Sequence, residues 1–193
     1  DGQDNQSTTY YAEYQYQKNL ESLGINWTSG IMNEYVDAVA ELFNGTNYRL
    51  NNAVFTQLDK KLGKRINLSL GARYEQFMLK TSELYEIAGD SINSFKAAKP
   101  VFRAGINYQL AEGTFLRSSW GQGYRFPSIA ELFIETEVTS GIYVYQNPEL
   151  EPESGWSSEL AIKQGFKIGN WGGYLDIAGF IMKYENMMEF SFG

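Results

Sequence analysis

The side chains that could do chemistry limit the possible functions before any fold is considered. The sequence contains no histidine and no cysteine, which removes the commonest general base and the usual ligands of a zinc site. Ser118, Ser119 and Ser128 could serve as nucleophiles of a hydrolase, but each would need a base beside it. The acids between Glu149 and Glu153 leave calcium binding open, without the ligand spacing of a calcium loop. We therefore predict no enzyme, no cofactor and no metal ligands.

Charge and composition narrow the class of protein further. The net charge is -7, which disfavours a nucleic-acid partner. Aromatic residues make up 16% of the chain, yet the mean hydropathy is -0.38, a combination typical of transmembrane barrels. No apolar run is long enough for a transmembrane helix. Residues 1–7 lack the charged start and apolar centre of a signal peptide, so we expect the chain to open within something larger.

The elements that position any site are predicted from period-two alternation. It is cleanest from Ile66 to Glu75, where Leu68 and Leu70 alternate with Asn67 and Ser69. Similar stretches predict four hairpins, at about residues 8–36, 49–79, 99–121 and 155–188, with short turns at one end. Longer connections follow at about 37–48, 80–98 and 122–154. The prediction is an all-β, antiparallel up-and-down meander of about eight strands.

A soluble sandwich also has one apolar face per strand, so alternation alone does not place these strands in a membrane. Strands of about 11 residues match the thickness of a tilted transmembrane strand better than the sandwich norm of about 5 to 6. Aromatic residues such as Trp27, Tyr74, Trp120 and Trp156 fall toward strand ends, as in a membrane girdle. Apolar residues occupy both faces of the last strand, around 174–185, so its facing stays open.

One segment carries a more specific signal. Residues 121–133 read GQGYRFPSIAELF, and residues 147–154 read NPELEPES. Pro127, Pro148 and Pro152 remove ladder donors, so the stretch between the strands is a long ordered loop. This order of motifs closely resembles TonB-dependent outer-membrane receptors, and residues 71–75 (GARYE) resemble a segment common in their barrel strands.

The resemblance implies a fold, a location and partners. Such receptors have a barrel of about 22 strands around an N-terminal plug. This sequence resembles the barrel portion only, roughly a third of it, because we identify no plug and no TonB box. The implied location is the bacterial outer membrane. The implied partners are outer-membrane lipid and lipopolysaccharide, the TonB complex through a plug not present in this chain, and a small-molecule or oligosaccharide ligand.

The implied function is to bind and import a scarce nutrient: a siderophore, haem, cobalamin or an oligosaccharide. Loop residues are the candidates for ligand contact, namely Tyr124, Arg125, Phe126, Glu131, Tyr143 and Tyr145. Charged strand residues are the candidates for facing the lumen or the plug, namely Arg73, Glu75, Arg103, Arg117 and Glu159.

Two alternatives remain from the residues themselves. A closed eight-stranded outer-membrane barrel would be an adhesin or a structural protein, because eight strands fill their own interior with side chains. A soluble carbohydrate-binding β-domain would use the aromatic residues as a sugar platform.

Overall fold

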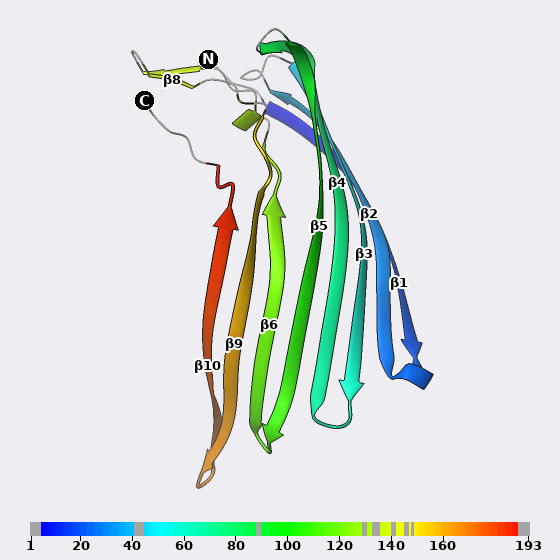
Figure 1. Cartoon of the computed structure of the whole chain (residues 1–193), viewed down its shortest axis with the longest axis vertical. Coiled ribbons are helices and arrows are strands. Elements are labelled where there is room, and N and C mark those ends of the chain that lie inside the picture. Colours follow the sequence, from blue (N-terminus) through cyan, green and yellow to red (C-terminus); the bar gives the residue numbers. More distant parts are fainter. Residues whose placement is uncertain are drawn as a thin grey trace.

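An eight-stranded antiparallel sheet makes up most of the molecule (Figure 1). The computed structural model describes residues 5–40, 45–87, 90–128, 131–132, 136–139, 142–144, 147 and 149–188. The strands are β1 (Asn5–Leu20), β2 (Ile25–Ala40), β3 (Gly45–Leu62), β4 (Ile66–Ile87), β5 (Asp90–Ala111), β6 (Thr114–Arg125), β7 (Thr136–Thr139), β8 (Ile142–Val144), β9 (Glu153–Ile168) and β10 (Trp171–Glu185).

The order of the large sheet is β1-β2-β3-β4-β5-β6-β9-β10, and β7 pairs with β8 in a separate small sheet. Every neighbouring pair in the large sheet is antiparallel, which confirms the predicted meander. β1 and β10 lie at the two ends of the order and do not pair with each other. The open sheet therefore contradicts the alternative of a closed eight-stranded barrel.

All four hairpins turn tightly at the same end of the sheet (Figure 1). Each turn contains one glycine with positive φ: Gly24 and Gly63 at 61°, Gly113 at 75° and Gly169 at 61°. Glycine adopts this left-handed conformation without the clash that a Cβ would cause. At Gly24 the turn includes a short 3-10 helix, η1 (Glu21–Leu23).

The connection expected at residues 80–98 is largely strand. β4 continues to Ile87 and β5 begins at Asp90. The two strands stay paired beyond Leu79, which lies opposite Phe95. Leu79 is buried, and Phe95 is packed against the same cluster. This inward-facing apolar pair favours a continued ladder where polar composition alone suggested a loop.

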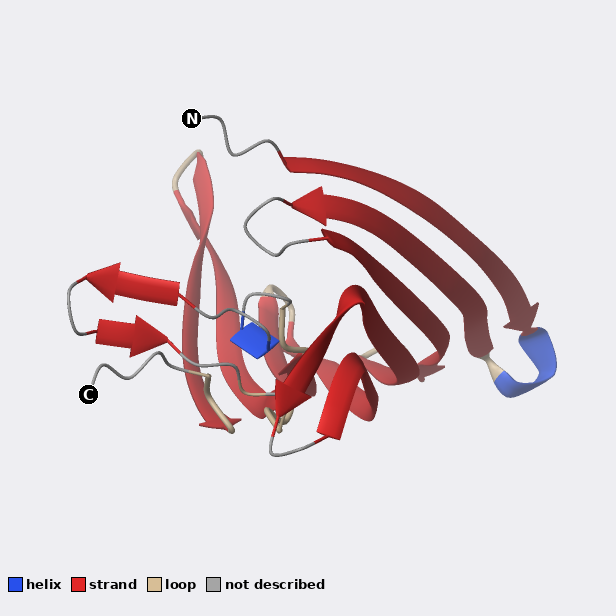
Figure 2. Cartoon of the chain, turned by 90° about the horizontal axis from the view of Figure 1, so that it is seen from above, coloured by secondary structure: helices blue, strands red, loops and turns tan. Residues whose placement is uncertain are grey.

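The two faces of the sheet differ in chemistry, and the sheet is strongly curved (Figure 2). The register places Val54, Leu70, Phe102 and Leu160 on the convex face, where all four are exposed. The concave face carries mostly polar and charged residues on β1 to β9. The same register decides the facing of β10: Phe180, Met182 and Tyr184 lie opposite Glu159, Ser157 and Gly155 on the concave side, and Ile177 and Ile181 lie on the convex side.

A small apolar cluster holds the loop after β6 against the concave face. Phe77, Leu79 and Leu132 are buried there, with Phe95, Phe126 and Leu150 packed around them. Leu132 belongs to a short helical turn at Glu131–Leu132, which lies inside the curve of the sheet (Figure 2). Among the described residues, no helix has the length and apolar character needed to cross a membrane.

Candidate functional site

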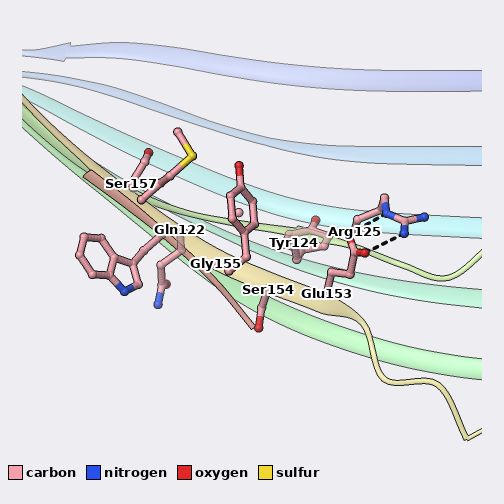
Figure 3. Close-up of a pocket in the computed structure, with 12 residues that line it drawn as sticks. Gln122, Tyr124, Arg125, Glu153, Ser154, Gly155 and Ser157 are labelled. Carbon is pink, nitrogen blue, oxygen red and sulfur yellow. Dashed lines mark hydrogen bonds and ion pairs between the residues drawn. The ribbon is translucent and has the colours of Figure 1, made fainter. Parts of the chain in front are cut away.

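Arg125, the last residue of β6, joins two carboxylates through its guanidinium. It lies opposite Glu153, the first residue of β9. Its Nε and Nη2 donate to the two carboxylate oxygens of Glu153, each at 2.8 Å. Its Nη1 and Nη2 donate to the two oxygens of Glu131, at 2.9 and 2.8 Å. Both pairs are bidentate, the strongest geometry for such contacts. We call these three residues the Arg125 clamp; Figure 3 shows the Arg125 and Glu153 side chains meeting.

Glu131 is held in place by the start of its own helical turn. The backbone N–H and the hydroxyl of Ser128 each donate to Glu131 Oε2 at 2.8 Å. In return, the Glu131 N–H donates to Ser128 Oγ at 3.3 Å. This reciprocal pattern is a capping box, which satisfies backbone donors at a helix N-terminus. The Ser-x-x-Glu spacing after Pro127 was a sequence signal that the sequence analysis missed.

Glu153 ties a fourth segment to the clamp. Its Oε1 also accepts a hydrogen bond from the backbone N–H of Met188, at 2.8 Å. Beside it, the Asn186 side-chain amide donates to Glu151 at 2.9 Å. The clamp therefore joins the end of β6, the loop helical turn, the start of β9 and the chain that follows β10.

Aromatic stacking fixes the loop next to the clamp. The Phe126 ring stacks on Phe77 of β4, with centroids 4.6 Å apart and planes 14° apart. Tyr124 contacts Phe126 with a centroid distance of 5.0 Å. The Leu132 side chain is fully buried, and its carbonyl accepts a hydrogen bond from the Asn147 N–H at 3.0 Å. Phe126 and Leu132 thus hold the loop against the sheet, and Asn147 is bonded to Leu132.

The clamp carboxylates stay ionised over a wide pH range. They lie beyond Trp120 and Trp156, which end the apolar convex rows of β6 and β9. Hydrogen bonds from Arg125, and then from the Met188 N–H, lower the pKa of Glu153 to about 2. The Arg125 bonds also lower the pKa of Glu131, with burial opposing them. At neutral pH the clamp therefore carries two negative charges and one positive charge.

The five charged strand residues predicted to face the lumen share the concave face. Arg73 pairs with the buried Glu75 at 2.6 Å. Arg117 pairs with Glu159 across β6 and β9 at 3.1 Å. Arg103 lies between Gly71 of β4 and Gly121 of β6, and within the described part of the chain it has no ion pair. That these residues face a plug stays a prediction.

The predicted ligand contacts are only partly brought together. Tyr124, Arg125, Phe126 and Glu131 gather around the loop anchor. Tyr143 lies in β8, where only the backbone is described, and Tyr145 lies outside the described residues. Within the described residues no group of three or more His, Cys, Asp or Glu side chains could hold a metal ion.

An open, curved, antiparallel sheet with an apolar convex face and a polar concave face is the wall of a transmembrane β-barrel. The chain matches the family described as "TonB dependent receptor-like, beta-barrel" over residues 1–193. It belongs to this family of receptors and transporters, which are not enzymes and reside in the bacterial outer membrane.

Solved structures support the fold. The haemophore receptor HasR of Serratia marcescens, solved with its haemophore HasA and haem, is 17% identical with a TM-score of 0.73, covering 95% of this chain and 34% of that chain. The copper transporter OprC is also 17% identical, with a TM-score of 0.64, and the match covers 89% of this chain and 30% of OprC. The siderophore receptor PirA of Pseudomonas aeruginosa is 15% identical, with a TM-score of 0.54, and the match covers 93% of this chain and 40% of PirA.

This chain thus spans between 30% and 40% of the length of these three proteins. A comparison with curated proteins gave no match. In outer-membrane barrels the tight turns are periplasmic and the long loops are extracellular, which predicts that the Arg125 clamp lies at the extracellular end.

Proposed function

We propose that this chain forms part of a receptor that binds a scarce nutrient at the cell surface and imports it. The nutrient would be a siderophore, haem, cobalamin or an oligosaccharide. The observation that supports this best is the Arg125 clamp, which holds the loop after β6 folded onto the concave wall at the extracellular end. A loop fixed in this way can present ligand contacts without first being ordered, which lowers the entropic cost of binding.

Within this proposal the loop residues have two kinds of role. Arg125, Phe126 and Glu131 position the loop, because their side chains bond to or stack on other parts of the chain. Tyr124, Tyr143 of β8 and Tyr145 are the candidates for touching the ligand. Arg73, Glu75, Arg103, Arg117 and Glu159 would line the lumen and contact a plug.

Import also needs partners beyond this chain. The convex apolar face would contact outer-membrane lipid and lipopolysaccharide. A plug not contained in this chain would connect the receptor to the TonB complex, which supplies the energy for release. A ligand can trigger that release only through its different affinities for the two states of the receptor.

The experiment is a growth and uptake assay in a strain from which the receptor gene has been deleted. A ferric siderophore, haemin, cobalamin and a malto-oligosaccharide are each supplied as the limiting nutrient, with and without a functional TonB. We expect the deletion to abolish uptake of one of them, and a plasmid-borne full receptor to restore it only when TonB is present. Equal uptake of all four by deletion and parent strains would refute the proposal for these nutrients.

A further inference from the structure

The convex face changes from apolar to polar at one level of the inner strands β3, β4 and β5. On β4 the convex side chains from Ile66 to Tyr74 are apolar or aromatic. The next one is the exposed Gln76, which lies opposite Asn52 of β3. Asn52 in turn accepts a hydrogen bond from the side-chain amide of Asn33 on β2, at 2.7 Å. We call Asn33, Asn52 and Gln76 the amide row.

The amide row lies at the level where the hydrocarbon of a membrane would end. Ten residue steps separate Ile66 from Gln76, and they rise about 34 Å along the strand at about 3.4 Å per residue. At a strand tilt of about 40° this rise is about 26 Å across the membrane, which matches the apolar band of about 25 Å on outer-membrane barrels. Because Ile66 follows a tight turn, the row lies at the opposite end of the band (Figure 1).

Two lysines lie just beyond the amide row. Lys96 of β5 lies opposite Met78, two residues past Gln76, and Lys80 of β4 lies opposite Ser94. Both lysine side chains are exposed on the convex face. Residues placed diagonally in this way on two strands are about 7 to 8 Å apart, so both ammonium groups can reach one anion. Within the described part of the chain neither lysine forms an ion pair.

The charge of this area is positive. Among the side chains described beyond the amide row on the convex face of β1 to β5, the one other charge is Asp37 of β2. Asp37 shares a row with Lys80, but Tyr48 of β3 lies between them. The two strands that carry them are about 10 Å apart. An anion beside Lys80 and Lys96 therefore meets two nearby positive charges and one more distant negative charge.

A shallow hollow of about 470 Å³ lies between the amide row and Lys96. Its lining combines apolar side chains with amide and ammonium donors: Leu50, Asn52, Gln76, Met78, Lys96 and Ala98. Ammonium groups bind phosphate as point charges, and amide N–H groups donate to phosphate or sugar oxygens. This mixed lining directly above an apolar band suits the head of an amphipathic molecule whose acyl chains lie along that band.

We propose that this patch, formed by the amide row with Lys80 and Lys96, binds a phosphate group of lipopolysaccharide. The proposal rests on the proposed receptor function and assigns its lipopolysaccharide contact to particular residues. The patch continues the lipid-facing band without a break, it lies at the headgroup level, and it is positively charged. Lipopolysaccharide is the anionic lipid of the outer leaflet, on the side where outer-membrane barrels have their long loops.

The test measures binding of lipid A, the phosphorylated membrane anchor of lipopolysaccharide, to the full receptor in detergent, by titration in native mass spectrometry. Lipid A with both phosphates, lipid A with both removed, and phosphatidylglycerol are compared. The variant Lys80→Gln/Lys96→Gln removes both charges and keeps most of each stem. The matched control is Lys60→Gln, because Lys60 is a convex lysine near a tight turn and lies between the apolar residues Ile25 and Leu68.

We expect the double variant to bind bisphosphorylated lipid A about tenfold more weakly than the parent, equivalent to about 1.4 kcal/mol, and Lys60→Gln to bind it as the parent does. Removal of both phosphates should weaken binding to the parent by a similar factor and leave binding to the double variant unchanged. Heat-modifiable gel mobility checks that each variant is folded.

Parent-like binding by the double variant, or an equal loss in Lys60→Gln, would overturn the proposal. Equal binding of the two forms of lipid A by the parent would also overturn it, and this comparison needs no variant. If the parent binds phosphatidylglycerol as tightly as lipid A, the assignment to lipopolysaccharide is wrong, because the patch would then accept any anionic lipid.

This experiment is independent of the nutrient panel. If no nutrient depends on the receptor but lipid A binding depends on Lys80 and Lys96, the lipopolysaccharide site stands and the import proposal fails. If uptake depends on the receptor and the double variant binds lipid A as the parent does, the import function stands and the lipopolysaccharide site fails.

Discussion

Replacing Arg125 with glutamine tests whether the clamp holds the loop in place. Arg125 is 46% exposed, whereas the Glu131 and Glu153 side chains are only 15% and 19% exposed. An exposed ion pair contributes about 0.2 to 1 kcal/mol, and bidentate geometry favours the upper end. Two such pairs at that upper end give about 2 kcal/mol for the docked loop, and the range of about 0.2 to 1 kcal/mol already includes screening by solvent. The substitution also leaves two neighbouring carboxylates without their shared cation.

The matched control is Arg117→Gln. Arg117 also pairs with a glutamate across β6 and β9 on the same face, but both side chains are exposed, at 49% and 38%. This pair is expected to contribute no more than about 0.5 kcal/mol. Lysine at position 125 should restore only part of the effect, because an ammonium cannot grip two carboxylates as a planar fork does.

The measurement is hydrogen exchange of the full receptor in detergent, read on a peptide that covers residues 126–132. The Leu132 N–H donates to the Ser128 carbonyl at 3.2 Å, so its exchange reports opening of the helical turn. A loss of about 2 kcal/mol predicts exchange about 30-fold faster in Arg125→Gln, with little change in Arg117→Gln. Equal protection in the two variants, with both receptors folded by gel mobility, would refute the reasoning.

Three further outcomes follow from the geometry. Leu132→Ala should destabilise the docked loop by about 2 to 4 kcal/mol, because it empties a fully buried site, and limited proteolysis should then cut the loop faster than in the parent. Protection of the loop from exchange should be constant from pH 7 to 5 and fall as the pH drops from 4.5 toward 2. The pKa of Glu153 is lowered from 4.5 to about 2 in the folded protein, so its stabilising effect is complete above pH 4.5 and is lost as the pH falls through about 2. A midpoint near pH 6 in exchange measurements would contradict this. Gly30→Ala should cost about 1 to 3 kcal/mol, since its Cβ would lie 2.6 Å from the Tyr14 carbonyl oxygen, whereas Gly71→Ala meets no atom closer than 3.7 Å; urea unfolding followed by heat-modifiable gel mobility separates the two.

The strands were predictable because the two faces of a barrel wall have different surroundings, so apolar and polar residues alternate along each strand. From Ile66 to Glu75 the alternation alone gave the strand and grouped its residues by face. Alternation did not give the facing of β10, because apolar residues occupy both faces of that strand. Only the pairing of Phe180 with Glu159 decides which side is concave.

The clamp shows a different limit. The capping box of Ser128 and Glu131 is local and could have been identified from spacing. The pairing of Arg125 with Glu153 joins residues 28 positions apart, and it exists because β6 pairs with β9 while β7 and β8 form their own sheet. The periodicity within each strand does not predict that β6 pairs with β9.

The geometry of the loop indicates that the motif residues Arg125, Phe126 and Glu131 hold the loop in place and do not select the ligand. Four hydrogen bonds from the Arg125 guanidinium go to Glu131 and Glu153, and one face of Phe126 is covered by Phe77. A ligand could use Arg125 only by displacing a carboxylate, at the cost of leaving that charge unpaired. Residues that hold the loop in place can be the same in receptors that import different ligands. Selectivity would then come from side chains that the fold leaves uncommitted.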